Sequence, residues 1–329
     1  GDGVNDIAVG AFGDKMDETG NASGGRGEGA VHIMFMNTDG SIDSTVEIND
    51  YTANGPALDQ RDNFGISIAN IGDLDGDGVN DLAVGTHQDD MDENGDDDGG
   101  TNRGAIHIMF MNTDGSVDST VEINDSTPNG PELSDDDHFG WSIANIRDLN
   151  GDGVNEIAVG ADDDDTGGDN RGTVYIMFMN TDGSVDSTEE INDSTANGPV
   201  LSDDDLFGYS IANIGDLNGD GVEDIAVGAT GDDDGGKNRG AIHIMFMNTD
   251  GSVDSTVEIN DSTPNGPELS IKDNLGFSIA NIGDLDGDGI NDIAVGAHQD
   301  DMDETGDDEG GTKRGAVHIM FLVGTPVPL

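Results

Sequence analysis

Acidic residues alternate with other residues in a nine-residue stretch that recurs along the chain. The clearest copy, residues 73–81, reads DLDGDGVND. Calcium binds oxygen atoms, and a tight loop supplies them from side chains at positions 1, 3 and 5 and from a backbone carbonyl at position 7. Gly78, at the sixth position, permits the sharp turn that such a loop needs. The stretch therefore predicts a cation-binding turn with the ligands Asp73, Asp75, Asp77, Val79 and Asp81.

The same turn occurs in three other complete copies and one partial copy. The predicted ligands of the complete copies are Asp148, Asn150, Asp152, Val154 and Glu156; Asp216, Asn218, Asp220, Val222 and Asp224; and Asp284, Asp286, Asp288, Ile290 and Asp292. The first copy retains only Asp2 and Asp6. An EF-hand does not explain the pattern, because its loop needs Glu at position 12 and flanking helices. A metal-free turn is the weaker alternative, because its alternating carboxylates would repel one another.

The charge of the chain narrows the classes of partner. It has 71 acidic residues against 11 Lys and Arg, a formal net charge of -60. Such a field repels nucleic acid and anionic membranes and attracts cations. There is no Cys and no apolar run of the roughly 20 residues that a membrane helix needs. Two explanations remain open: a calcium-loaded extracellular protein, or an acidic surface adapted to high salt.

The chain is built from near-identical units. The GDG turn recurs at Gly1, Gly76, Gly151, Gly219 and Gly287, with spacings of 75, 75, 68 and 68 residues. Each unit contains short apolar runs separated by turn residues, and no run with helical periodicity. The Asp-Gly pair in 113–116 is typical of a hairpin turn. In the second unit the expected strands are 64–71, 82–85, 104–112 and 119–125, called A to D below.

Strand C is apolar on both faces, which predicts that both of its faces are covered. Four-stranded units of this kind fit the all-β fold of a β-propeller, with antiparallel blades packed radially, or an open array of the same blades. We expect one domain over 1–329. Its units are approximately 1–63, without strand A; 64–138; 139–206; 207–274; and 275–329, without strand D. Further repeats beyond this chain or a neighbouring copy would complete the two ends.

The ordered motifs carry a family resemblance. FGISIANI, DLDGDGVND, LAVG and GAIHI, with their copies along the chain, resemble the FG-GAP repeat of integrin α-subunit propellers and bacterial surface proteins. The resemblance implies that each repeat is a blade and that the acidic turn between strands A and B binds calcium, about one ion per blade. Leu275 replaces the Phe of the FG motif, and about five blades stand where integrin-like propellers have seven.

Two weaker sets of site residues follow from the loops. The loop between strands B and C repeats the alternating acidic pattern, which predicts a second metal site or a solvated acidic loop at Asp90, Asp92, Asn94 and Asp96, and at Asp301, Asp303, Thr305 and Asp307. Sequons of the Asn-X-Ser type predict glycosylation sites or unmodified loops at Asn21, Asn124, Asn192 and Asn260. We also expect Arg103, Arg171, Arg239 and Arg314 to pair with loop carboxylates.

The sequence contains no recognised catalytic motif. We therefore expect a secreted or cell-surface prokaryotic protein that is not an enzyme and has a structural or adhesive role. Its partners would be calcium and either copies of itself, as in an extracellular filament, or a surface protein or polysaccharide. The alternative is a polysaccharide-binding or polysaccharide-degrading propeller, for which Trp141, Arg147 and Tyr175 are the residues that depart most from the repeat.

Overall fold

The computed structural model describes residues 3–15, 27–90, 101–234, 236–300 and 314–323. Within them the protein consists of β-strands and connecting turns, as the sequence predicts. No helix in this part is long and apolar enough to cross a membrane. The chain divides into two compact units, Gly1–Ile143 with Met177–Thr188, and Ala144–Ile176 with Glu189–Leu329. The boundary between the units runs through the third of five sheets.

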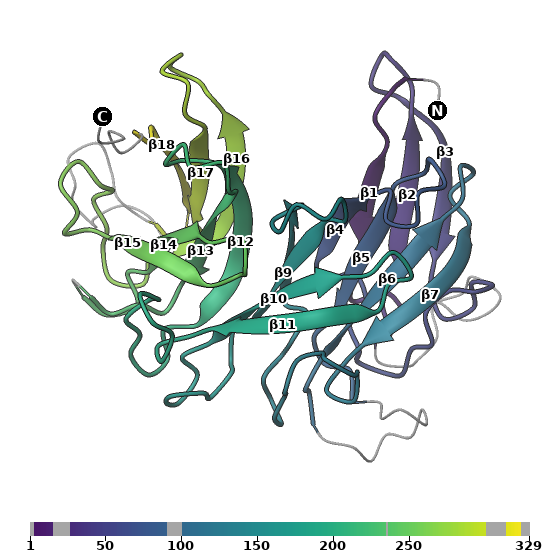
Figure 1. Cartoon of the computed structure of the whole chain (residues 1–329), viewed down its shortest axis with the longest axis horizontal. Helices are drawn as coiled ribbons and strands as arrows, with labels where there is room; N and C mark the ends of the chain where they lie inside the picture. Colours follow the sequence, from purple (N-terminus) through teal and green to yellow (C-terminus); the bar gives the residue numbers. More distant parts are fainter. Residues whose placement is uncertain (1–2, 16–26, 91–100, 235, 301–313, 324–329) are drawn as a thin grey trace. The chain divides into compact units, whose positions relative to one another are not determined.

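Each sheet is a propeller-type blade whose strands follow one another in chain order (Figure 1). Blade 1 contains β1 (Ile7–Gly10), β2 (Val31–Met36) and β3 (Ile42–Ile48). Blade 2 contains β4 (Ile68–Gly72), β5 (Asp81–Thr86), β6 (Ala105–Met111) and β7 (Val117–Ile123). Blade 3 contains β8 (Ser142–Arg147), β9 (Glu156–Ala161), β10 (Thr173–Met179) and β11 (Val185–Ile191).

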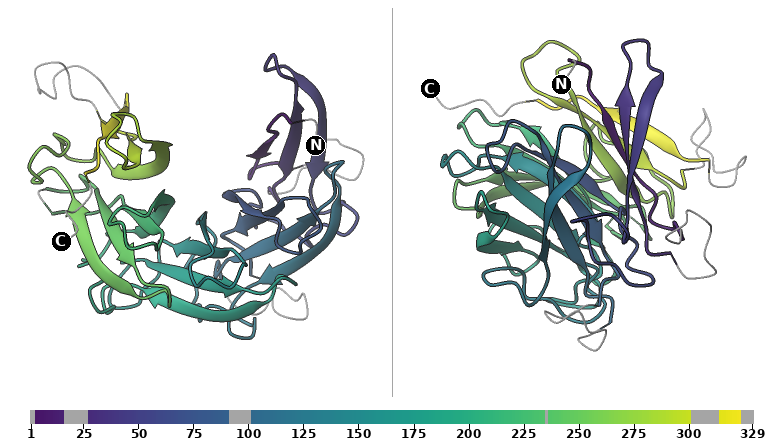
Figure 2. Two further views of the ribbon diagram at one scale, coloured as in Figure 1. Left: turned by 45° about the horizontal axis from the view of Figure 1, so that its top comes forward. Right: turned by 90° about the vertical axis from the view of Figure 1, so that its right-hand side faces the viewer.

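Blade 4 contains β12 (Phe207–Gly215), β13 (Asp224–Ala229), β14 (Ala241–Met247) and β15 (Val253–Ile259). Blade 5 contains β16 (Leu275–Gly283), β17 (Asp292–Ala297) and β18 (Ala316–Met320). Neighbouring strands pair antiparallel in blades 1, 2, 4 and 5, and the strands of blade 3 lie in the order β11-β10-β9-β8. Figure 2 shows the strands of the blades in two further views. The all-β, blade-based fold predicted from the sequence is confirmed.

The C–D hairpin forms at the predicted Asp-Gly turn. In blade 2 the amide of Asn112 donates to the carbonyl of Ser116 at 2.8 Å, and Gly115 adopts a φ of 81°. Asp114 Oδ1 accepts from the Ser116 hydroxyl at 2.6 Å, which braces the turn. Strand A of blade 2 begins at Ile68, four residues later than expected. Phe64 instead forms a parallel bridge with Gly29 of blade 1.

Apolar faces of adjacent blades cover each other within each unit. In the first unit Val31 and Ile33 of strand C in blade 1 pack in one core with Leu82 and Val84 of strand B in blade 2. In the second unit Ile242, Ile244 and Phe246 of blade 4 pack with Ile293 and Val295 of blade 5. We call the strand C residues that face the next blade the trailing face of a blade. The residues of strand B that receive them form the leading face of the next blade.

Close backbone contacts set the spacing of these blades. A Cβ atom added at Gly228 of blade 4 would lie 2.2 Å from the carbonyl oxygen of Gly276 in blade 5. The Ser210 hydroxyl donates to that same carbonyl at 2.6 Å. A Cβ atom added at Gly10 of blade 1 would lie 1.9 Å from the carbonyl oxygen of Gly65 in blade 2. Two glycines per junction are therefore required where the backbones of adjacent blades approach each other. One lies near the end of strand B, and the other is the glycine of the FG motif in the next blade.

We predict that Gly228→Ala destabilises the protein by about 3 kcal/mol or more, because its methyl group would overlap a backbone oxygen that cannot move alone. Gly13→Ala is the control, since nothing lies within 4 Å of its Cβ position. That substitution should change the unfolding free energy by less than about 0.5 kcal/mol. Urea unfolding of the two variants measures the difference, and equal stability would contradict the proposed spacing role.

Candidate metal centres

The A–B turn of blade 2 is folded around its own carboxylates. Asp73 Oδ2 accepts from the amide of Gly78 at 2.9 Å. Asp75 Oδ1 accepts from the amide of Asp77 at 3.0 Å, and Asp77 Oδ1 accepts from the amide of Val79 at 2.8 Å. Oxygen atoms of Asp73, Asp75 and Asp81 lie within 4.8 Å of one another. The turn thus brings together three of the four side chains that the spacing predicts as ligands, and Asp77 is not part of this group.

The other complete turns repeat the hydrogen bond to the first aspartate, and two of the three also gather carboxylate oxygens. Oxygen atoms also gather within 4.8 Å in two more groups of three, Asp148, Asp152 and Glu156, and Asp284, Asp286 and Asp292. Asp216 of blade 4 accepts from the amide of Gly221 at 2.8 Å, like its equivalents, and Asp220 Oδ1 accepts from the amide of Val222. Asn150 and Asn218 donate their amide nitrogens to Asp152 and Asp220, at 3.1 and 3.0 Å. In blade 1, Asp6 is described and Asp2 lies outside the described residues.

The ninth residue of the turn differs from the rest because it is buried and holds two strands together. Asp81 Oδ2 accepts from the amide of Leu74 at 2.9 Å, and its Oδ1 accepts from the amide of Met111, the last residue of strand C, at 3.0 Å. Asp224 makes the same bonds to Leu217 and Met247, at 2.8 and 3.0 Å. The ninth carboxylate therefore fastens the turn to strand C in addition to facing the predicted ion.

These clusters are suited to a hard cation. Burial, together with repulsion from the neighbouring turn carboxylates, raises the pKa of Glu156 to about 7 and that of Asp224 to about 6. A divalent cation would remove this penalty by neutralising the oxygens, because it favours the charged form of each carboxylate. Clustered carboxylate oxygens are of the hard type that calcium prefers as ligands.

The weaker site predictions fall largely outside the described part of the chain. Asp92, Asn94, Asp96, Asp301, Asp303, Thr305, Asp307 and Asn21 all lie there. Asp90 is described and accepts a hydrogen bond from the amide of Asn102. The second metal site therefore stays a prediction.

The three described sequon asparagines are buried in a turn at the end of strand D. Asn124 Nδ2, the atom that a glycan would modify, donates to Glu122 at 2.6 Å, and Asn124 Oδ1 accepts from the Ser126 hydroxyl at 2.7 Å. Asn192 and Asn260 accept from Ser194 and Ser262 in the same way. The folded chain holds these asparagines as turn-forming residues, and their glycosylation stays a prediction.

Arginine side chains pair with loop carboxylates, as predicted, at Arg103, Arg171 and Arg239. Arg103 binds Asp125 and Asp135, Arg171 binds Asp193 and Asp203, and Arg239 binds Asp261. Each pair joins the start of strand C to the D–A loop. In a chain with so few cations, these arginines serve the fold.

The residues that interrupt the repeat also have structural contacts. Tyr175 is buried, and its hydroxyl donates to Asp164 Oδ2 at 2.9 Å. Arg147 adopts a φ of 61°, where the equivalent Gly215 and Gly283 have φ values of 83° and 73°. Its guanidinium group lies 3.1 Å from Glu223 Oε1 of blade 4. Trp141 packs edge-on against His87, with 4.9 Å between ring centroids.

Buried acids near the B–C loops were not predicted from the sequence. Asp205 and Asp232 in blade 4 are at most 3% exposed. Burial and their mutual repulsion raise the pKa of Asp232 to about 7. Asp62 and Asp89 are buried at the same places of blade 2. The signal available in the sequence was that an Asp recurs two residues before the FG position and another three residues after the end of strand B in each of the four complete copies.

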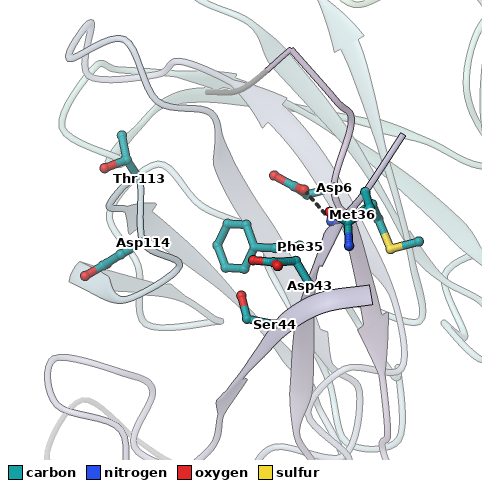
Figure 3. A pocket seen from close by; sticks show the side chains of 8 residues that line it. Asp6, Phe35, Met36, Asp43, Ser44, Thr113 and Asp114 are labelled. Atoms are coloured by element: carbon teal, nitrogen blue, oxygen red, sulfur yellow. Dashed lines mark hydrogen bonds between the residues drawn. The ribbon is translucent and has the colours of Figure 1, made fainter. Parts of the chain in front are cut away.

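A polar hollow lies beside the C–D hairpin of blade 1. It has a volume of about 550 Å³ and is lined by Asp6, Phe35, Asp43, Ser44 and Asp114, among others. Figure 3 shows the Phe35 ring among these polar groups and the 3.0 Å hydrogen bond from the Met36 amide to Asp6. This hollow contains the ninth residue of the partial first turn and no set of residues arranged for catalysis.

Comparison with known proteins agrees with the repeated blades and their acidic turns. The family model of the FG-GAP repeat matches four segments, residues 64–109, 139–177, 207–245 and 275–320. The chain belongs to the FG-GAP repeat family. The four matches begin at the residue that opens each FG motif, and each includes an entire acidic turn.

Integrin α subunits are among the relatives of this FG-GAP protein. Integrin alpha-6 of Gallus gallus is 36% identical over 165 residues, which are 50% of this chain and 14% of that protein. Integrin alpha-PS2 of Drosophila melanogaster is 29% identical over 238 residues, 70% of this chain and 15% of that protein. Integrin alpha-4 of Xenopus laevis is 33% identical over 168 residues, 50% of this chain and 15% of that protein. The chain therefore spans about a seventh of the length of these relatives.

The two roles of the turn carboxylates predict different mutant behaviour. Asp220→Asn should lower the melting temperature in calcium but not in EDTA, because the exposed fifth position mainly serves the ion. Asp224→Asn should cost about 1 to 3 kcal/mol in both conditions, because Asn cannot accept two backbone amides with two oxygens. Thermal and urea unfolding measure both, with Asp254→Asn on exposed β15 as the control. Recovery of wild-type stability by Asp224→Asn in EDTA would contradict the fastening role.

Two histidines of strand C predict a pH dependence. His107 and His243 are buried against Phe64 and Phe207, and burial lowers the pKa of each to about 4. Unfolded histidine has a pKa of about 6.5, so the unfolded state binds more protons between pH 6.5 and 4. Each histidine should therefore reduce the unfolding free energy by about 2 to 3 kcal/mol on going from pH 7.5 to 4.5.

His107→Tyr introduces the residue that blade 3 has at the equivalent position. It should remove the contribution of His107 to the loss of unfolding free energy at low pH. Urea unfolding of the wild type and the variant at the two pH values measures the difference between their pH dependences. An unchanged pH dependence in His107→Tyr would mean that this imidazole is already protonated in the folded protein.

Proposed function

We propose that this FG-GAP protein is a calcium-stabilised, secreted or cell-surface protein with a structural or adhesive role. More specifically, we propose that the chain is the repeating subunit of an extracellular filament. The observation that carries the proposal is the convergence of carboxylates in the A–B turns, repeated from blade to blade. Calcium fixes each turn, and through the ninth residue it also fixes the end of strand C.

Charge and composition support calcium as the ion. The net charge of -60 destabilises a compact chain by self-repulsion, and each divalent ion removes two units of that charge. A chain without cysteine has no disulfides to brace its loops, so bound ions that link two strands are the available braces. Relationship to integrin α subunits supports a surface location and an adhesive role with a protein or polysaccharide ligand.

The repeat-breaking residues do not support the alternative of a polysaccharide-degrading enzyme. Tyr175 is 1% exposed and donates its hydroxyl to Asp164, so a substrate would not reach it. Arg147 is bound to Glu223 of the neighbouring turn. We propose on this basis that the chain is not an enzyme.

Thermal unfolding in 2 mM calcium, in EDTA and in molar potassium chloride tests the calcium role. We expect calcium to raise the melting temperature by roughly 10 °C or more, since several sites each add stability in proportion to the logarithm of ligand excess. EDTA should reverse the shift, and magnesium should substitute poorly because it demands near-ideal octahedral geometry. A melting temperature that rises with potassium chloride concentration and does not change with EDTA would instead support an acidic surface adapted to high salt.

A further inference from the structure

Two histidines of strand C are buried without a hydrogen-bond partner among the described residues. His107 of blade 2 and His243 of blade 4 are each 1% exposed, and neither ring nitrogen of either side chain is hydrogen-bonded to the described part of the chain. Burial lowers the pKa of both to about 4, so both imidazoles are neutral at pH 7. A bound ion is one explanation for buried polar atoms of this kind. Neutral imidazole is also the form of histidine that binds metals.

The strand C histidine faces a buried aspartate that follows strand B of the same blade. In blade 2, His107 Nε2 lies 4.0 Å from Asp89 Oδ2, which is too far for a hydrogen bond. In blade 5 the equivalent atoms of His318 and Asp300 lie 3.4 Å apart. Two ligands of one zinc ion lie about 3.4 Å apart at a tetrahedral angle and approach 4 Å as the angle widens. The separation of the two side chains therefore suits one shared ion.

Blade 3 shows the contact that forms when the histidine is replaced. Tyr175 stands at this position, and its hydroxyl donates to Asp164 Oδ2 at 2.9 Å. Asp164 is the counterpart of Asp89 in the repeat. The longer tyrosine thus reaches the aspartate directly, whereas the shorter histidine leaves a separation that an ion can bridge.

Blade 4 brings two further carboxylates to its histidine. Asp205, from the loop before the FG motif, and Asp232, after strand B, are 3% and 2% exposed. The amide of Gly231 donates to the carbonyl of Asp205 at 3.0 Å, so these two loops are in contact. Glu258 lies directly opposite His243 in the pairing of β14 with β15. Burial and repulsion from Asp205 and Glu258 raise the pKa of Asp232, which shows that the three carboxylates converge.

The buried carboxylates of blade 4 are not neutralised by a basic side chain. In the part of the chain that the structure describes, neither Asp205 nor Asp232 forms an ion pair with Lys or Arg, because the strand C arginines bind other carboxylates. Asp205 Oδ2 accepts from the amide of Ser202 at 2.6 Å, and Asp232 Oδ1 accepts from the amide of Asp234 at 2.8 Å. These bonds use one oxygen of each carboxylate. Buried charges are paired with another charge or coordinate a metal.

Blade 2 has the same arrangement. The side-chain amide of Asn63 donates to Gln88 at 2.8 Å, which holds the loop before the FG motif against the loop after strand B. The aspartates of these loops, Asp62 and Asp89, are 2% and 3% exposed. The residue of strand D opposite the histidine is again a glutamate. The set thus occurs in each of the two compact units.

We propose that these residues bind a first-row divalent metal ion such as zinc, with one site in blade 4 and one in blade 2. The ligands are Asp205, Asp232, His243 and Glu258 in blade 4, and Asp62, Asp89, His107 and Glu122 in blade 2. An imidazole among the ligands favours zinc-like ions, whereas calcium takes oxygen ligands. Each site lies near the start of strand C, and the A–B turn meets the other end of that strand. The zinc sites are therefore separate from the proposed calcium sites.

Zinc titration of the 329-residue chain in saturating calcium tests the two sites. His243→Tyr and His107→Tyr each introduce the residue of blade 3. Each should weaken binding at its own site roughly 100-fold or more, because even the loss of an outer-shell partner costs about 10- to 100-fold in metal affinity. Each single variant should therefore bind about one zinc ion fewer than the wild type, and the double variant two fewer. Isothermal titration calorimetry measures both the number of ions and their affinity.

Asp254→Asn is the control, because it removes an exposed carboxylate of β15 that belongs to neither site. It should leave zinc binding unchanged. X-ray absorption at the zinc edge should show an imidazole nitrogen among the ligands of the bound ions. If a tyrosine variant does not fold by circular dichroism, Asp232→Asn takes its place, since it removes a charged ligand and keeps the size of the side chain.

Three outcomes would overturn the proposal. They are a wild type that takes up no zinc, equal zinc binding by the wild type and the double variant, and a zinc-edge spectrum of oxygen ligands alone. A loss of zinc binding in Asp254→Asn as large as in the histidine variants would overturn it too. None of these results depends on whether calcium stabilises the chain, because the histidines lie outside the A–B turns.

Discussion

The central strand of a blade is apolar on both faces, so no blade can bury it alone. Val31 and Ile33 become core only because blade 2 lies against them, and blade 5 covers Ile242 and Ile244 in the same way. Burial of such side chains is worth about 1.5 to 3 kcal/mol each, which makes contact between neighbours the main source of stability. The close glycine contacts and the ordered A–B turns both follow from this requirement that blades approach each other.

Much of this arrangement could be predicted from the sequence. The spacing of carboxylates in 73–81 predicted where oxygen atoms gather, because that geometry is local to one turn. The Asp-Gly pair predicted each C–D hairpin for the same reason. The start of strand A was predicted less well, since Phe64 pairs with Gly29 of the preceding blade, and a contact between repeats leaves no mark on local spacing.

The long-range role of the ninth turn residue was also beyond sequence reasoning. Asp81 looks like one more ligand, yet its oxygen accepts from Met111, 30 residues away, once the blade has formed. Burial of Asp62 and Asp205 depends likewise on loops that meet only in the folded blade. The sequons were recognised from three letters, whereas the burial of Asn124 depends on its hydrogen bonds with Glu122 and Ser126.

The contact between Gly228 and Gly276 involves backbone atoms and a serine that recur in each complete copy of the repeat, so it does not depend on which blade stands next to which. A gene that gains or loses one whole repeat by recombination therefore creates no new kind of junction. Selection can then adjust the length of such a protein in steps of one blade without first inventing an interface. The near identity of the repeats keeps that route open, because any two blades can become neighbours.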